Sequence, residues 1–355
     1  MGKISKIIRD EWLFFVAVTV TIVSSLAFKR MPEITKDDLK ILIILFNFLV
    51  ITKGLEKSGL FVKIAFYFEK GNPFLKLTLL SGILSMFVTN DIALFTVVPL
   101  TLSLSIPPEK IMFLVILETL SVNGASALTP FGNPQNIFIY YYYHLDFTNF
   151  IKAIFPFFMF SFALILGIAL LWERKEIKIT EKKCEEELNR KKAVIYGSFF
   201  IMFIGVIFHI FPIEISIIPP LFALFKDKTV LRKIDYFLLL TFLAFFGFTS
   251  NISSALRFSL SNPHKTLIYS AFISQIISNV PAALLLAKFT NLWKSLLMGV
   301  NVGGFGTLVG SLANLIAFKL FKNKFNNLTR KYLLTFHLMS FLLFFVSLMF
   351  SLLIT

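Results

Sequence analysis

Long apolar runs, separated by short polar segments, make up most of this chain. The runs at 12–28, 150–172, 193–211 and 332–354 approach or exceed the ~20 apolar residues that an α-helix needs to cross a bilayer. The sequence lacks the alternating segments of ~10 residues that build a transmembrane β-barrel. The pattern therefore predicts an all-α polytopic membrane protein.

The apolar runs form two similar sets, and each contains plain helices, a hairpin with a polar centre and an interrupted helix. For the first set we expect helices at 12–28 and 40–54, an amphipathic piece at 56–69, a hairpin at 73–105, an interrupted helix at 110–143 and a helix at 149–172. For the second set we expect 193–211, 214–226, 234–250, a short piece at 252–261, a hairpin at 264–290, an interrupted helix at 293–320 and a last span at 331–354.

Polar strings interrupt both predicted hairpins, with VTNDIA at 88–93 and ISNVPA at 277–282. Gly-rich segments follow, SVNGASALTPFGNPQN at 121–136 and GVNVGGFGTLVGSLAN at 299–314. Broken helices at membrane depth are tolerated only where they face protein or a water-filled cavity. Breaks at matching places in two halves are the best sequence pointer to the substrate site of a transporter. The aligned segments are identical at Val122/Val300, Asn123/Asn301, Thr129/Thr307, Gly132/Gly310 and Asn136/Asn314.

This repetition predicts two inverted-topology repeats, each with a re-entrant helical hairpin and an interrupted helix. We divide the chain into an N-terminal helix and loop at 1–37, a first inverted repeat at 38–172, a charged cytoplasmic linker at 173–192 and a second inverted repeat at 193–355.

The distribution of basic residues predicts the orientation. If the N-terminus is inside, the inner segments carry far more Lys and Arg than the outer ones, as the positive-inside rule requires. These inner segments are 1–10, 53–76, 105–111, 173–192, 226–233 and 319–331. The same orientation brings the two hairpins in from opposite sides and leaves the C-terminus outside.

Composition supports a multi-pass protein of the cytoplasmic (inner) membrane. The chain is 57% hydrophobic, with 45 Phe and a mean hydropathy of +0.80. Its net charge of +15 is better explained by cytoplasmic loops than by nucleic-acid binding, so no nucleic-acid partner is expected. The one cysteine, Cys184, allows no disulfide within the chain and no Cys-based metal motif. The first helix resembles a signal peptide but is long for one, and we expect it to remain uncleaved.

Each break has the residues to start a new helix. Asn90 and Asp91 favour helix caps, Pro134 and Pro281 suit a first turn, and Ser311 can cap a fourth helix. Four helix N-termini are therefore expected to converge near the midplane, where free N–H groups suit an anion. The carbonyls released at each break, with Asn and Thr oxygens, suit a Na⁺ ion near Asn90 and Asn279.

Two ionisable residues lie inside predicted membrane segments, where such groups are functional by default. Asp91 can bind a cation, carry a proton or cap its helix. Glu118 lies one to two turns before Asn123 and either takes part in coupling or pairs structurally.

At these residues the chain resembles the ion transporter superfamily, which includes citrate–metal carriers, divalent-anion/sodium symporters and arsenite efflux pumps. The resemblance covers roughly residues 38–320 and is nearest to citrate-transporter-like permeases. It implies that the two hairpin tips and the two interrupted helices enclose the substrate and the coupling ions. The implied substrate- and ion-binding residues are Thr89, Asn90, Asp91, Asn123, Thr129, Pro130, Gly132, Asn133, Pro134, Gln135, Asn136, Ser278, Asn279, Val280, Pro281, Asn301, Gly306, Thr307, Gly310, Ser311 and Asn314.

The chain departs from this family in one respect that bears on the substrate. Di- and tricarboxylate symporters carry Ser-Asn-Thr at both tips, whereas here the third positions are Asp91 and Val280. The departure puts a dicarboxylate substrate in question and leaves proton coupling open.

The expected function is secondary active transport of an anion or oxyanion, coupled to Na⁺ or H⁺, by alternating access. A cation/proton antiporter or an arsenite-type efflux carrier is the alternative. The sequence shows no nucleophile–base set, His-metal arrangement or Walker A motif, so neither an enzyme nor an ATP-driven pump is expected. The expected partners are a small ion and the lipid bilayer; homodimerisation stays open, and no cofactor beyond bound Na⁺ is expected.

Overall fold

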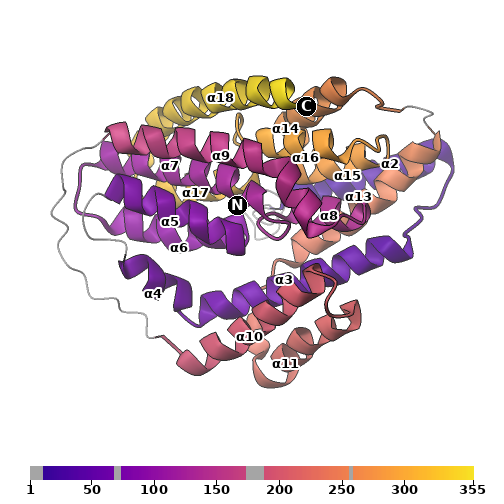
Figure 1. The fold of residues 1–355 in the computed structure, drawn as a ribbon, viewed down its shortest axis with the longest axis horizontal. Helices are drawn as coiled ribbons and strands as arrows, with labels where there is room; N and C mark the ends of the chain where they lie inside the picture. Colours follow the sequence, from indigo (N-terminus) through magenta and orange to yellow (C-terminus); the bar gives the residue numbers. More distant parts are fainter. Residues whose placement is uncertain (1–10, 68–72, 173–187, 256–258) are drawn as a thin grey trace.

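The computed structural model describes residues 11–67, 73–172, 188–255 and 259–355 (Figure 1). Helices and the turns between them make up all of these ranges, as expected for an all-α protein. The elements of the first half are α2 (Trp12–Phe28), α3 (Lys36–Lys57), α4 (Leu60–Tyr67), α5 (Pro73–Phe87), α6 (Asn90–Ser103), α7 (Pro108–Ala125), η1 (Ser126–Leu128), α8 (Pro134–Tyr142) and α9 (Phe147–Trp172).

The second half follows a similar order, with three additional short helices between its first two long ones. Its elements are α10 (Arg190–Ile207), η2 (Ile213–Ile217), α11 (Ile218–Lys226), α12 (Lys228–Leu231), α13 (Tyr236–Ala255), α14 (Pro263–Ile277), α15 (Asn279–Ala287), α16 (Trp293–Val302), α17 (Leu312–Lys324), η3 (Asn326–Leu328) and α18 (Thr329–Ile354).

Local sequence explains several helix starts. Thr35 and Asp38 form a reciprocal capping box at α3, in which the Thr35 hydroxyl accepts from the Asp38 N–H at 3.1 Å. The side chain of Asn189 accepts from the Lys192 N–H at 3.1 Å, so α10 begins at Arg190. Asn262 caps α14 in the same way, at 3.0 Å from the Lys265 N–H.

Two predicted boundaries need correction. The linker prediction at 173–192 lies largely outside the described residues, but its last residues, 190–192, already belong to α10. The separate short piece predicted at 252–261 is wrong in its first residues, because α13 continues to Ala255; positions 256–258 lie outside the described residues. The helix passes the polar Asn251 without a break because this side chain is buried and donates to the hydroxyls of Ser24, at 3.2 Å, and Ser25, at 2.9 Å, on α2.

Within the described residues, four helical segments are long and apolar enough to cross a membrane. Their exposure differs strongly, since 94% of the apolar window in Pro108–Leu128 is buried but only 33% of that in Asn326–Ile354. The first segment therefore lies at the centre of the molecule, and α18 lies at its surface.

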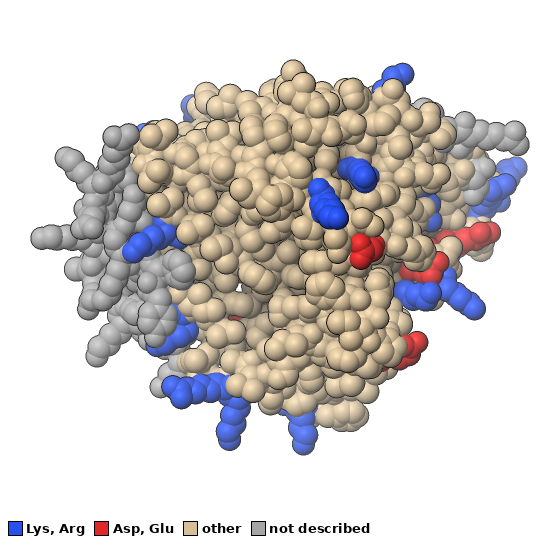
Figure 2. Space-filling view, in the orientation of Figure 1, with Lys and Arg blue, Asp and Glu red and all other residues tan. Residues whose placement is uncertain are grey.

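The outer face exposes apolar side chains, as expected for a surface in contact with lipid. Large exposed apolar side chains line α18, namely Leu334, Leu338, Leu342, Phe345, Met349 and Leu353. Figure 2 shows a face covered mostly by uncharged residues, with most of the visible Lys and Arg towards its edges.

The packing partners of the two halves correspond. α5 packs against α6 and α7, and α14 packs against α15 and α16. The helix after each polar break contacts the opposite half, α6 against α17 and α15 against α8. The first helix of each half also crosses over, since α2 packs on α13 and α10 packs on α3 (Figure 1).

Candidate functional site

Four helix starts meet around one very small cavity in the middle of the fold. It is lined by Asn90 and Asp91 of α6, Pro134 and Gln135 of α8, Asn279 and Val280 of α15, and Ser311 and Leu312 at α17, with Leu238 of α13 closing one side. Its volume of about 10 Å³ leaves roughly the room of one water molecule. The convergence of four helix N-termini that the sequence predicts is therefore present in the structure.

The two polar breaks differ in backbone conformation. Thr89, before α6, has φ −60° and ψ 147°, an ordinary extended conformation. Ser278 is the single residue between α14 and α15. Its backbone angles, φ 75° and ψ 155°, are ones that residues other than glycine rarely adopt. Strain of this kind persists where the surroundings enforce it, commonly at functional sites. Here the next residue is fixed by a hydrogen bond from the Asn279 N–H to the Gly310 carbonyl at 3.0 Å.

The predicted side-chain caps are wrong in detail. Asn90 is the first residue of α6 rather than its cap, and its Oδ1 accepts only from the adjacent Asp91 N–H, at 3.1 Å. Ser311 does occupy the N-cap position of α17, but its side chain makes no capping hydrogen bond. The same holds for Thr89, Asn133 and Ser278 at the other three starts. The four helix starts thus converge without side-chain caps, which suits an anion.

Two crossed hydrogen bonds join the interrupted helices of the two halves. Asn123 donates to Asn314 at 2.7 Å, and its counterpart Asn301 donates to Asn136 at 3.0 Å. The amide of Asn136 also donates to three carbonyls of its own break, those of Ser126, Ala127 and Thr129. The amide of Asn314 donates in the same way to the carbonyls of Gly304 and Thr307. These four side chains are therefore engaged in positioning the breaks.

Hydrogen bonds also join the break in each interrupted helix to the preceding hairpin helix of the same half, which is α5 in the first half and α14 in the second. The Thr129 hydroxyl donates to the Met86 carbonyl at 2.6 Å, and the Thr307 hydroxyl donates to the Gln275 carbonyl at 2.9 Å. Close backbone approach requires glycine here, because a Cβ at Gly132 would lie 2.2 Å from the Ser126 carbonyl oxygen. Gly306 has φ +97°, which favours glycine directly.

Several buried polar atoms around the cavity have no partner among the described residues. They include Asp91 Oδ1, Asn133 Oδ1, Gln135 Nε2, Ser278 Oγ and Asn301 Oδ1. An unmade buried hydrogen bond costs ~1–3 kcal/mol, so these atoms are positioned to bond with an ion, a water molecule or a ligand. Gln135 is only 1% exposed and lines the cavity directly.

The remaining predicted residues do not line the small cavity. Gly310 lies beside the Gly303 carbonyl, where a Cβ would approach to 2.6 Å. Pro281 lies in the first turn of α15, as expected, and Pro130 is buried in the turn before α8. Glu118 is buried in α7 and lines neither cavity of the site.

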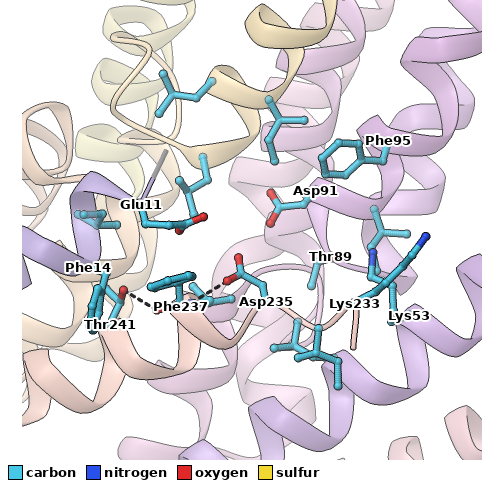
Figure 3. A pocket seen from close by; sticks show the side chains of 18 of the residues that line it. Glu11, Phe14, Lys53, Thr89, Asp91, Phe95, Lys233, Asp235, Phe237 and Thr241 are labelled. Atoms are coloured by element: carbon cyan, nitrogen blue, oxygen red, sulfur yellow. Dashed lines mark hydrogen bonds between the residues drawn. The ribbon is translucent and has the colours of Figure 1, made fainter. Parts of the chain in front are cut away.

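A second, larger cavity of about 490 Å³ shares Asp91, Leu238 and Leu312 with the small one. Figure 3 shows the carboxylates of Glu11, Asp91 and Asp235 around this space, with Lys53 and Lys233 at one side. We call it the vestibule. Among the described residues, no group of three or more His, Cys, Asp or Glu side chains is arranged to hold a metal ion.

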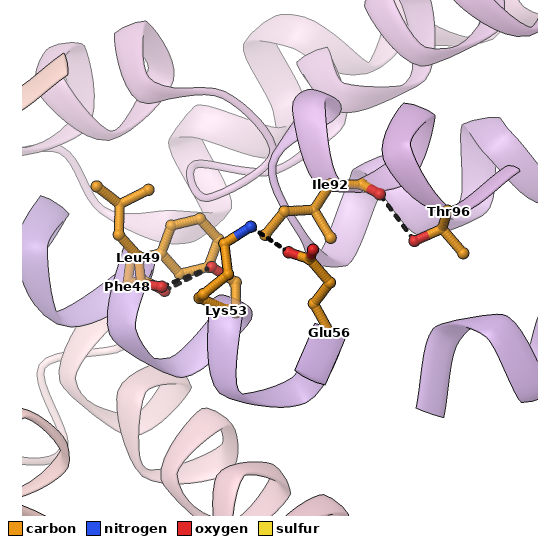
Figure 4. A network of polar contacts seen from close by, with 7 residues as sticks. Phe48, Leu49, Lys53, Glu56, Ile92 and Thr96 are labelled. Atoms are coloured by element: carbon orange, nitrogen blue, oxygen red, sulfur yellow. Dashed lines mark hydrogen bonds and ion pairs between the residues drawn. The ribbon is translucent and has the colours of Figure 1, made fainter. Parts of the chain in front are cut away.

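The charged vestibule residues other than Asp91 were not assigned to the site from the sequence alone. Asp235 looks like a helix cap there and does accept from the Leu238 N–H at 2.9 Å. Lys53 looks like a side chain near a span end, and its amine pairs with Glu56 beside Ile92 of α6 (Figure 4). Only the fold reveals that both positions border the same space as Asp91.

Comparison with known proteins gives three matches. The profile of the citrate transporter family matches residues 7–291, which include both polar breaks and the segment 121–136. The chain is 36% identical over 260 residues to the uncharacterised transporter MJ0456 of Methanocaldococcus jannaschii, covering 70% of each chain. It is 34% identical over 306 residues to the inner membrane protein YbiR of Escherichia coli, covering 79% of each chain.

Proposed function

Because the chain belongs to the citrate transporter family, we propose that it carries a small anion or oxyanion across a cytoplasmic membrane by secondary active transport, coupled to Na⁺ or H⁺. The resemblance predicted from the motifs is confirmed, and the protein is a multi-pass membrane transporter rather than an enzyme. The anion, the coupling ion and the mechanism are our proposal.

The observation that carries the proposal is the meeting of four helix N-termini without side-chain caps around one polar cavity. Each helix start contributes roughly half a positive charge and free N–H groups. Four such ends stabilise an anion without a full positive charge on a side chain. The oxygens of Asn90 and Asn279, with nearby carbonyls, are the proposed Na⁺ ligands.

We further propose that the halves are inverted repeats that rock about this cavity. The support is the matched packing, in which α3, α5, α6, α7, α8 and α9 correspond in order to α13, α14, α15, α16, α17 and α18. The crossed Asn pairs and the paired Thr bonds follow the same correspondence. The crossing of α2 and α10 supports a first repeat that starts at α2 rather than at residue 38.

The remaining topology is proposed from charge. The N-terminus and the linker 173–192 lie inside and the C-terminus lies outside, so that the hairpins α5–α6 and α14–α15 enter from opposite sides.

A test of this function uses purified protein in proteoliposomes with citrate, succinate and sulfate as probes. Imposed inward Na⁺ and H⁺ gradients are applied separately and together. We expect one of the anions to accumulate only when a gradient is present. Failure of all of them to accumulate under every gradient would contradict the proposal.

The second candidate is a cation/proton antiporter or an arsenite-type efflux carrier. Asp91 favours it, because this carboxylate stands at the first break where the second has Val280. Under the main proposal Asp91→Asn weakens Na⁺ dependence steeply and leaves the pH profile of residual transport nearly unchanged. Wild-type transport that needs no Na⁺, with a variant that loses all pH dependence, would favour the antiporter instead.

A further inference from the structure

Glu118 is a fully buried carboxyl group outside both cavities of the site. It is 0% exposed and lies in α7, the most deeply buried long helix. The Thr101 hydroxyl of α6 donates a hydrogen bond to Glu118 Oε1. The second oxygen, Oε2, is buried and has no partner among the described residues.

No described cation compensates this carboxyl group. The ionisable side chain whose electrostatics involve Glu118 is Tyr332 of α18, which is also 0% exposed and carries no positive charge. Within the described residues, no hydrogen bond or ion pair joins Glu118 to the other ionisable groups on α7 and on the helices packed against it. These groups are Lys76, Asp91, Glu109, Lys110, Lys152, Lys294, Lys319, Lys322, Lys324, Arg330, Lys331 and His337.

An ionised carboxylate in these surroundings would be an isolated buried charge. Burying such a charge without a partner costs several kcal/mol, roughly, and a proton removes that cost. A proton on Oε2 leaves Oε1 free to accept from Thr101, as observed. Burial without a compensating cation thus favours the neutral carboxylic acid.

We propose that Glu118 is the proton-carrying residue of the transport cycle, at a site separate from the anion cavity. The inference rests on the proposed transport function. Thr101 belongs to α6, the helix that starts at the first break, so the contact links the carboxyl group to Asn90 and Asp91. At 1.5 Å per residue, Glu118 lies ~7.5 Å along α7 from Asn123 and ~15 Å from the start of the helix at Pro108.

The cycle moves one proton. In the structure Glu118 holds its proton while α6, α7 and α18 enclose it. When these helices separate and water reaches Oε2, the O–H bond breaks, the proton passes to water and the carboxylate is hydrated. Return of the closed arrangement requires a proton to be taken up again. The aligned position in the second half is Leu296, so this site occurs in one half only.

The first test measures protonation without any substrate. Infrared spectra of purified protein at neutral pH are compared for wild type, Glu118→Gln and Glu109→Gln. Glu109 is a suitable control because it lies on the same helix and its side chain is 52% exposed. We expect the protonated-carboxyl band to lose intensity in Glu118→Gln and to be unchanged in Glu109→Gln. An unchanged band in Glu118→Gln would overturn the proposal.

The second test separates this proposal from the proposed function. Citrate is the probe in proteoliposomes, measured as accumulation under a pH gradient and as exchange without one. We expect Glu118→Gln to lose accumulation at least tenfold while keeping citrate exchange, and Glu118→Asp to restore part of the accumulation. A Glu118→Gln variant that accumulates citrate like wild type would overturn the role of Glu118 alone. If the wild-type protein neither accumulates nor exchanges citrate, the coupling role of Glu118 is also overturned. The infrared test would then still report whether Glu118 is protonated.

Discussion

At the residue scale, the polar side chains of the breaks divide into those that hold the backbone and those left without partners. The four Asn residues at 123, 136, 301 and 314 bond to one another and to carbonyls. Asp91, Gln135 and Ser278 instead keep buried side-chain atoms without described partners, and Asn301 belongs to both groups because its Oδ1 is also without a partner. The sequence-based prediction assigned both groups to one binding site. Asn and Ser side chains can either position a backbone or bind a ligand, and their spacing along the chain does not separate the two roles.

Gly132 offers a sharp test of the positioning role. Its Cβ would lie 2.2 Å from the Ser126 carbonyl oxygen, so Gly132→Ala must displace the first interrupted helix. We expect a loss of most transport and a lower thermal unfolding midpoint. The matched control is Gly167→Ala in α9, where nothing lies within 4 Å and alanine favours the helix by about 0.5–1 kcal/mol. Equal behaviour of the two variants would contradict the close approach at Gly132.

At the element scale, hydrophobic patterning predicted nearly every helix, since apolar length and Gly or Pro punctuation leave few other ways to satisfy the backbone in lipid. Trp12–Phe28 was predicted with its observed ends. The error at 252–261 arose because Asn251 looks like a helix end until its buried partners on α2 are known. Packing between distant helices, such as α10 on α3, leaves no local sequence signal.

The contact between α10 and the α11–α12 corner provides a pH-dependent test outside the membrane. Lys192 Nζ lies 2.7 Å from Asp227 Oδ2, and Thr229 donates to Oδ1 at 2.6 Å. Burial alone would raise the pKa of Asp227, but hydrogen bonds from Lys192 and Thr229 outweigh it and hold this pKa below its usual value.

The sign of the effect follows from that lowered pKa. The pair stabilises the folded state above the unfolded pKa of ~3.9, and this stabilisation is lost as the pH falls through the folded value. Asp227→Asn should cost about 1 kcal/mol at neutral pH, since Lys192 is partly exposed, and should flatten the acid side of a thermal-unfolding profile. An unchanged acid profile would contradict the pairing, and Asp146→Asn serves as an exposed control.

At the scale of the whole molecule, helices from both halves of the proposed repeat line the small cavity. The sequence indicated the repeat because its Gly-rich segments align, but it could not show that the first helices cross over to the opposite half. The vestibule could not be predicted from the sequence either, because Glu11, Asp91 and Asp235 come from distant parts of the chain.

Membrane orientation can be tested at Cys184, which lies outside the described residues. We expect an impermeant maleimide to label it in inverted vesicles and not in intact cells, because 173–192 carries dense basic charge. The protein has one cysteine, so Cys184→Ser gives the background. Ready labelling in intact cells would contradict the proposed orientation.

The central claim, that the four meeting helix starts enclose the transport site for the anion and its Na⁺, is tested most directly by Asn90→Ala and Asn279→Ala. Both side chains line the small cavity and neither caps its helix, so their removal should leave the fold largely intact. The measurement is gradient-driven uptake of whichever probe anion the wild type accumulates, with Asn326→Ala as an exposed control. We predict that each site variant loses at least ten-fold in uptake while the control and the thermal unfolding midpoints are unchanged. Near-normal uptake by both site variants would contradict the claim.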